Sequence, residues 1–234
     1  MRELYLTPNP APGEIVSRIV AALDEAARQR LHDAATVRCL DSVLRGSAEL
    51  SESGAAALPS PEGSGYPALN LAGGLRQRAQ ESIAAERIAS MMGTLALEAI
   101  PPTVIGALGP MPAWHELPAE TVATQYARYT REGDLSALTG QFLAHDLDQV
   151  FRYLVTRDLS DFVGEGAAST VTEAARLVDR VGDFCRERGV APGLRRYEQD
   201  LQEIVYLPPE RRARELAPVT RQGLLDGLAE LSGG

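Results

Sequence analysis

The chain has 234 residues, 44% of them hydrophobic and 24% charged, a balance typical of globular proteins with a full hydrophobic core. It contains no lysine, so all 23 basic residues are arginine, and Schiff-base catalysis and a P-loop lysine are excluded. The net charge of −9 argues against a nucleic-acid surface, and no stretch has the roughly 18 apolar residues of a membrane span. We therefore expect a cytoplasmic protein that binds neither nucleic acid nor a membrane.

Aromatic residues make up only 5% of the chain, so the core must consist mainly of Leu, Val and Ala. Such a core favours close-packed helices over a β-sandwich, which draws on β-branched and aromatic residues. The lack of lysine, together with many Ala, Gly and Pro residues, is typical of a GC-rich genome and indicates a bacterial protein. The expected fold class is mainly α: an irregular multi-helix bundle with an extended Pro-rich N-terminal arm and a long flexible loop.

The first predicted unit, residues 1–45, consists of an arm and a pair of helices. Three prolines between positions 8 and 12 prevent a regular helix, so the arm is expected to be extended. Apolar residues at helical spacing then predict one helix over 13–30 and a second over 33–44.

The second predicted unit, residues 46–74, is a linker or mobile loop. The segment is rich in Ser, Gly and Pro and contains few residues that could form a core. Tyr66, Leu69 and Leu71 could dock its far end. Its composition would allow the first 45 residues to separate from the rest of the chain.

The third predicted unit, residues 75–234, is the main helical domain. Its first helix is expected over 75–100 and ends at Pro101-Pro102, where an ordered connection containing the only tryptophan, Trp114, begins. Further helices are predicted over 119–131, 134–160, 169–188, 194–206, 209–216 and 220–231.

The segment 141–164 is the most informative part of the chain. It contains three of the four phenylalanines and an apolar stripe at helical spacing, formed by Leu143, Leu147, Val150, Phe151 and Leu154. Because such a stripe has to be buried against other elements, we expect this helix to anchor the fold.

The same helix contains the best candidate for catalytic chemistry, the pair His145-Asp146. A His-Asp pair can bind one metal ion through imidazole and carboxylate, as in HD-type metal-dependent hydrolases, which also need an upstream His and a downstream Asp. His115 precedes the pair, and Asp179 or Asp183 follows it. The order of residues therefore allows a divalent-metal hydrolase.

Several observations favour a packed or surface histidine instead of a metal ligand. His115 lies in the loop sequence PAWHELP, which does not predict a helix, and a second His-Asp dipeptide, His32-Asp33, shows that such pairs recur without a motif around them. Other catalytic systems have less support. The chain has no GxSxG elbow, and both cysteines, Cys39 and Cys185, have apolar neighbours that predict buried reduced thiols.

The leading hypothesis is a non-catalytic helical adaptor or scaffold subunit that binds a protein partner or associates with itself. It needs no cofactor, and it rests on the abundant amphipathic helices and the weak catalytic signals. The alternative is the metal-dependent hydrolase, with a divalent metal ion as cofactor. A third possibility is a small-ligand module lined by Met91-Met92 and Trp114.

Overall fold

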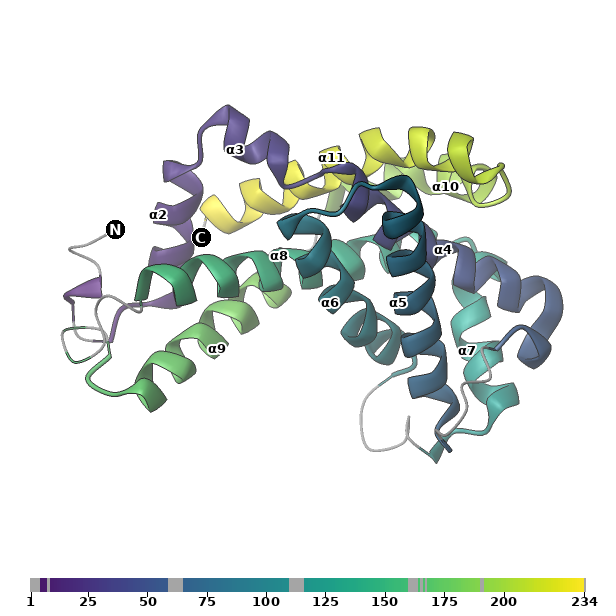
Figure 1. The fold of residues 1–234 in the computed structure, drawn as a ribbon, viewed down its shortest axis with the longest axis horizontal. Coiled ribbons are helices and arrows are strands. Elements are labelled where there is room, and N and C mark those ends of the chain that lie inside the picture. Colours follow the sequence, from purple (N-terminus) through teal and green to yellow (C-terminus); the bar gives the residue numbers. More distant parts are fainter. Residues whose placement is uncertain are drawn as a thin grey trace.

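The structure is a computed structural model that describes residues 5–7, 9–58, 65–109, 116–159, 164, 166, 168–189 and 192–233. These residues form ten α-helices and two 3₁₀ helices, and no β-strand occurs among them. The mainly α fold class is therefore confirmed. Figure 1 shows an elongated arrangement in which α8 and α9 extend to one side, while α5, α6 and α7 gather at the other.

The N-terminal region contains two short helices, so the single helix predicted over 13–30 is wrong. α2 (Pro12–Ala22) starts at a proline, whose missing N–H costs little at a helix start, and α3 (Glu25–Arg30) follows a short break. Asp24 causes this break, because its extended backbone and its carboxylate, 2.6 Å from the backbone nitrogen of Ala27, cap the second helix.

The helix boundaries predicted around the segment 46–74 are also wrong. α4 (Ala34–Ser53) continues well beyond position 45 and is followed by the 3₁₀ helix η1 (Gly54–Ala57). α5 begins earlier than predicted and spans Pro67–Glu86. The part of the predicted loop that falls on residues 59–64 lies outside the described residues.

Gly46 does not end α4, because it lies where this helix crosses α5. A Cβ atom at this position would lie 2.7 Å from Cδ2 of Leu75 on α5, so a larger residue would have to displace this buried side chain where the two helices approach closely. Leu44 and Leu50 on either side are buried, which stabilises the helix across this point.

The single helix predicted over 75–100 is divided between α5 and α6 (Met91–Ala107). The break lies at Arg87, whose φ of 56° places it in the left-handed region, as is common at the end of a helix. Ser90 then caps α6, with its hydroxyl oxygen 2.8 Å from the backbone nitrogen of Gly93.

Prolines lie inside two helices, and one of these helices was predicted to end at its proline pair, Pro101-Pro102. Pro101-Pro102 belongs to α6, and Pro218 belongs to α11 (Pro209–Ser232), which replaces the two helices predicted there. An interior proline costs about 3 kcal/mol, whereas each buried Leu, Ile or Val contributes about 1.5–3 kcal/mol. Buried neighbours flank the prolines in both helices, so core packing outweighs the local cost; these neighbours are Ile100, Val104, Leu216 and Val219.

The central elements agree well with prediction. α7 (Ala119–Arg131), α8 (Leu135–Leu159) and α9 (Val171–Arg188) lie within three residues of the expected bounds. The predicted helix 194–206 is a 3₁₀ helix η4 (Pro192–Tyr197) followed directly by α10 (Glu198–Ile204).

α8 anchors the fold, as its apolar stripe predicted. It packs against α6 on one side and α9 on the other, and it also contacts α4 and α11. The stripe residues Leu143, Leu147, Val150 and Phe151 are buried, and Leu154 is partly buried against them. α8 therefore supplies the surface against which α6 and α9 pack.

One hydrophobic core includes side chains from Tyr5 near the N-terminus to Leu231 near the C-terminus. Leu44 and Leu50 both belong to it, one on each side of the predicted boundary at residue 45. The division into three units remains a prediction. Among the described helices, none is both long enough and apolar enough to cross a membrane.

Candidate functional site

The candidate site is a cavity of about 570 Å³ between α4, α5 and the segment that joins α10 to α11. This volume is within the usual range of small-ligand and side-chain pockets. The charged side chains that line it are four arginines and three acids: Arg38, Arg45, Arg78, Arg212, Asp41, Glu49 and Glu86.

Helical spacing places these side chains on single faces of their helices. On α4 the charged residues recur at positions 38, 41, 45 and 49, and on α5 the lining residues recur at 78, 82 and 86. Ser42 holds the two helices together, since its hydroxyl donates to the carbonyl oxygen of Leu75 at 2.7 Å. The remaining side is formed by Tyr206 to Pro209 and the first turn of α11.

At one end of the cavity the start of α11 is fixed to α4. Arg212 donates to both carboxylate oxygens of Asp41, with Nη2 3.1 Å from Oδ2, and also to the carbonyl oxygen of Leu207 at 2.7 Å. Arg38 donates to the carbonyl oxygen of Pro209 at 2.9 Å, and its Nη2 lies 2.5 Å from Oε1 of Glu86. Most of these side chains are buried, so this end is built as a rigid wall.

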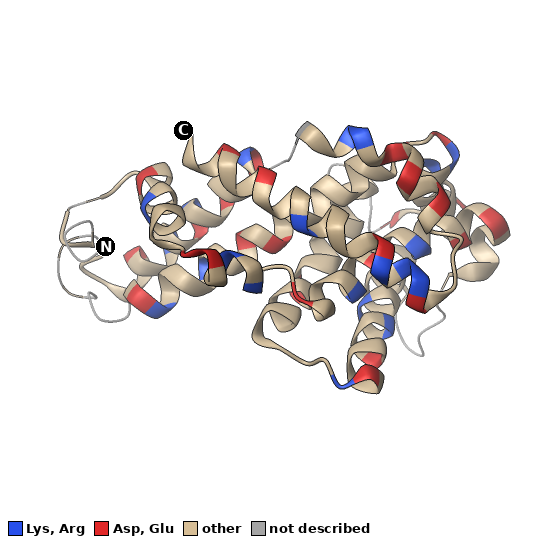
Figure 2. Ribbon diagram, turned by 90° about the horizontal axis from the view of Figure 1, so that it is seen from above, with Lys and Arg blue, Asp and Glu red and all other residues tan. Residues whose placement is uncertain are grey.

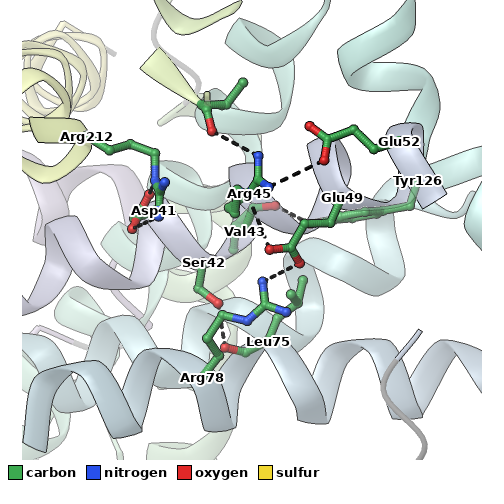
Figure 3. Close-up of polar contacts among 11 residues, drawn as sticks. Asp41, Ser42, Val43, Arg45, Glu49, Glu52, Leu75, Arg78, Tyr126 and Arg212 are labelled. Carbon is green, nitrogen blue, oxygen red and sulfur yellow. Dashed lines mark hydrogen bonds and ion pairs between the residues drawn. The ribbon is translucent and has the colours of Figure 1, made fainter. Parts of the chain in front are cut away.

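At the other end Glu49 connects two arginines from different helices (Figure 3). One carboxylate oxygen lies 3.2 Å from Nε of Arg45, and the second lies 2.7 Å from Nη1 of Arg78 on α5. Arg45 also donates to the carbonyl oxygen of Val205 at 3.3 Å and lies 3.5 Å from Glu52. This end is more open, because the side chains of Glu49 and Arg78 are 29% and 39% exposed.

An aromatic ring lies at the edge of the cavity. Tyr206 is 54% exposed, although it is flanked by the partly buried Leu207 and belongs to the segment that carries Pro208. Arginine forms planar, two-pronged hydrogen bonds to carboxylates and phosphates, and tyrosine provides contact area with little loss of side-chain entropy. The cavity therefore has the chemistry to bind an anionic group next to an apolar or planar one.

Elsewhere in the molecule the charges alternate. Figure 2 shows arginines and acids interspersed along the helices, without a continuous arginine stripe in that view. The cavity differs because its lining carries one more positive than negative side chain in a chain of net charge −9. This site was not predicted from the sequence. The available signal was the run of charged residues three and four apart on α4, which resembles the solvated face of any surface helix.

Of the sequence-predicted pair on α8, Asp146 is buried and His145 is half-buried. Burial raises the pKa of Asp146 well above its usual range, and the nearby carboxylate of Asp33 raises it further. Burial lowers the pKa of His145, and Arg186 contributes in the same direction. Nδ1 of His145 and Oδ1 of Asp146 are buried without a hydrogen-bond partner among the described residues. The two side chains therefore have different charged neighbours, Arg186 near His145 and Asp33 near Asp146.

The other predicted metal ligands are placed differently. Asp179 lies on α9 and accepts a hydrogen bond from Arg152 at 2.6 Å, and Asp183 on the same helix pairs with Arg186. His115 lies outside the described residues. In the part of the chain that the structure describes, no group of three or more His, Cys, Asp or Glu side chains is arranged to hold a metal ion.

The other residues singled out in the sequence are the two cysteines, Met91-Met92, Trp114 and the second His-Asp pair. Cys39 and Cys185 are buried free cysteines, as predicted, and burial raises the pKa of both thiols far above the usual value. Met91 is 52% exposed and Met92 is packed against the core, whereas Trp114 lies outside the described residues. His32 precedes Asp33, whose carboxylate caps α4 by accepting from the backbone N–H of Thr36 at 2.9 Å.

Comparison of the chain with protein-family models, with curated proteins and with solved structures found no match.

Proposed function

We propose that the protein is a non-catalytic helical adaptor whose arginine-lined cavity binds an acidic segment of a partner protein. The observation that carries the proposal is the convergence of four arginines from three separate elements on one cavity of about 570 Å³. Arginine clusters are a recurring means of recognising acidic or phosphorylated peptide motifs.

The residues at the rim of the cavity favour a peptide over a free anion as the ligand. Tyr206 is half exposed beside Leu207 and Pro208, so an apolar surface adjoins the guanidinium groups. Tyrosine and arginine are, with tryptophan, enriched among the energetically dominant positions of protein interfaces. A peptide segment would use both surfaces, with its carboxylates against the arginines and a neighbouring side chain against the tyrosine ring.

The attraction of this partner would come from the charges that line the cavity and not from the net charge of the whole chain. The chain carries −9, so an acidic partner is repelled at long range and attracted only close to the cavity. Added salt should weaken the attraction at the cavity and also screen the long-range repulsion, and the rate of association should remain modest.

The test is the binding of fluorescein-labelled hexaglutamate, measured by fluorescence anisotropy at low salt. Arg78→Ala should weaken binding about tenfold, which corresponds to about 1.4 kcal/mol. Arg180→Ala is the matched control, since Arg180 is exposed on α9 away from the cavity, and it should leave the affinity within about twofold.

Three results would count against the proposal. Wild-type protein that does not bind hexaglutamate contradicts it, and so does an equal loss in the two arginine variants. The third is a cavity that binds inorganic pyrophosphate but not the peptide, which would indicate a small phosphate ligand instead of a partner protein.

A second candidate function, the metal-dependent hydrolase, is favoured by one observation. His145 and Asp146 each have a buried polar atom without a hydrogen-bond partner among the described residues, and such atoms call for an explanation. Metal analysis of protein purified without chelator tests this function. It predicts about one equivalent of divalent metal that is lost in His145→Ala, and less than about a tenth of an equivalent would contradict it.

A further inference from the structure

We infer that Glu49 is a built-in competitor of the partner, and that its carboxylate lies where the leading acidic side chain of the partner binds. This inference rests on the proposed function and adds to it the mode of anchoring and a restraint on binding. The position is defined by two arginines on different helices, at 3.2 Å (Arg45) and 2.7 Å (Arg78) from the two oxygens of the one carboxylate.

The geometry of this contact is that of a bound ligand. Each carboxylate oxygen of Glu49 is paired with a different guanidinium, so both ends of the group are recognised. A carboxylate of a partner peptide that entered the cavity would find the same two donors only after Glu49 had left. Because the two groups are chemically equivalent, they compete directly for the two arginines.

Glu49 is able to leave, whereas Asp41 is not. The side chain of Glu49 is 29% exposed, so it can turn into water and regain hydration. The side chain of Asp41 is only 11% exposed and is held by both prongs of Arg212. Asp41 is therefore part of the wall, and Glu49 is the movable acid.

Glu86 provides a comparison within the same cavity. Its carboxylate is 42% exposed and pairs with Arg38, whose other terminal nitrogen is already held by the carbonyl oxygen of Pro209. Displacement of Glu86 would thus free donors on one guanidinium, whereas displacement of Glu49 frees donors on two, Nε of Arg45 and Nη1 of Arg78. Removal of the two charges should have unequal effects on the affinity for an acidic peptide.

The experiment compares labelled hexaglutamate binding to wild type, Glu49→Gln and Glu86→Gln. Glutamine keeps the size and one acceptor of glutamate but not its charge, so Glu49→Gln should bind about tenfold more tightly and Glu86→Gln within about threefold of wild type. Glu49→Asp, which keeps the charge on a shorter side chain, should give an intermediate gain. Thermal melting followed by circular dichroism checks that each variant is folded.

The results separate this inference from the proposed function. If wild type binds, Arg78→Ala weakens binding, and Glu49→Gln leaves the affinity unchanged, the adaptor function stands and the competitor role is wrong. An equal gain in Glu49→Gln and Glu86→Gln would show a general charge effect and would also overturn the competitor role. If neither wild type nor Glu49→Gln binds, both proposals fail.

Discussion

Arg212, in the first turn of α11, forms a two-pronged ion pair with Asp41 in the middle of α4, 171 positions earlier in the chain. Both side chains are only 11% exposed, so the pair is almost entirely removed from water. It fixes the start of the C-terminal helix against α4 and closes the rigid end of the candidate cavity (Figure 3).

Arg212→Ala should lower the free energy of unfolding by about 3 kcal/mol, because it leaves the buried carboxylate of Asp41 with only the longer pairing to Arg38, whose Nη1 lies 3.9 Å away. The measurement is urea denaturation followed by circular dichroism. Arg18→Ala is the matched control, since Arg18 pairs with Glu14 at 3.2 Å while both are about half exposed, and its loss should cost less than about 0.5 kcal/mol. Similar losses in both variants would mean that burial does not strengthen the Arg212–Asp41 pair.

The sequence predicted helices well where apolar spacing and end signals agree. α8 illustrates this, because its stripe from Leu143 to Phe151 is buried as expected. Prediction failed where glycine and proline were taken as local signals only. Gly46 and Pro101 both lie inside helices, since α4 approaches α5 closely at the first and core packing outweighs the backbone cost at the second.

The candidate cavity could not be predicted in the same way. Its walls come from three elements, and the contact between Asp41 and Arg212 depends on how α11 folds back over α4. Periodicity reveals which residues share a helix face but not which faces meet. The contiguous pair His145-Asp146 was therefore the candidate visible in the sequence, whereas the arginines that converge in space are far apart in the chain.

Gly93→Ala should destabilise the protein by about 1–3 kcal/mol. The added Cβ would lie 2.3 Å from Cβ of Ala35 on α4, and neither of these groups can rotate away. Gly73→Ala is the comparison, because a Cβ there meets nothing within 4 Å, and it should stabilise α5 by about 0.5–1 kcal/mol. The changes in the free energy of unfolding of the two variants are expected to have opposite signs. A Gly93→Ala variant at least as stable as wild type would contradict the close crossing of α4 and α6.

Asp146→Asn should remove a pH dependence of stability. Burial raises the pKa of Asp146 in the folded state, and the carboxylate of Asp33 adds to this effect. The folded state then binds a proton that the unfolded state has released, so stability falls as the pH rises from the ordinary value of about 3.9 to the raised one. The slope from one proton is at most about 1.4 kcal/mol per pH unit.

This dependence is measured as the free energy of unfolding between pH 4 and 8. Asp146→Asn should be at least as stable as wild type at neutral pH, and the difference between them should shrink toward pH 4. Asp200→Asn, at an exposed aspartate of α10, should leave the slope as it is. Parallel curves for wild type and Asp146→Asn would show that Asp146 is ionised in the folded protein.

Glu198→Gln should destabilise the start of α8 in a manner that depends on pH. Glu198 on α10 accepts hydrogen bonds from the backbone N–H groups of Leu135 at 3.0 Å and Ser136 at 2.7 Å, so it caps a helix 62 positions away. Burial alone would raise the pKa of Glu198, but hydrogen bonds from Gln202, Ser136 and Leu135 outweigh it and lower the pKa.

Because the pKa of Glu198 is lowered in the folded state, its contribution is present above the ordinary glutamate value and is lost as the pH falls through the folded value. Glu198→Gln should therefore cost about 1 kcal/mol at pH 7, the usual value of a capping side chain, and less at pH 3. Urea denaturation at the two pH values measures this, with the exposed Glu187→Gln as control. An equal loss at both pH values would mean that the cap depends on the shape of the side chain and not on its charge.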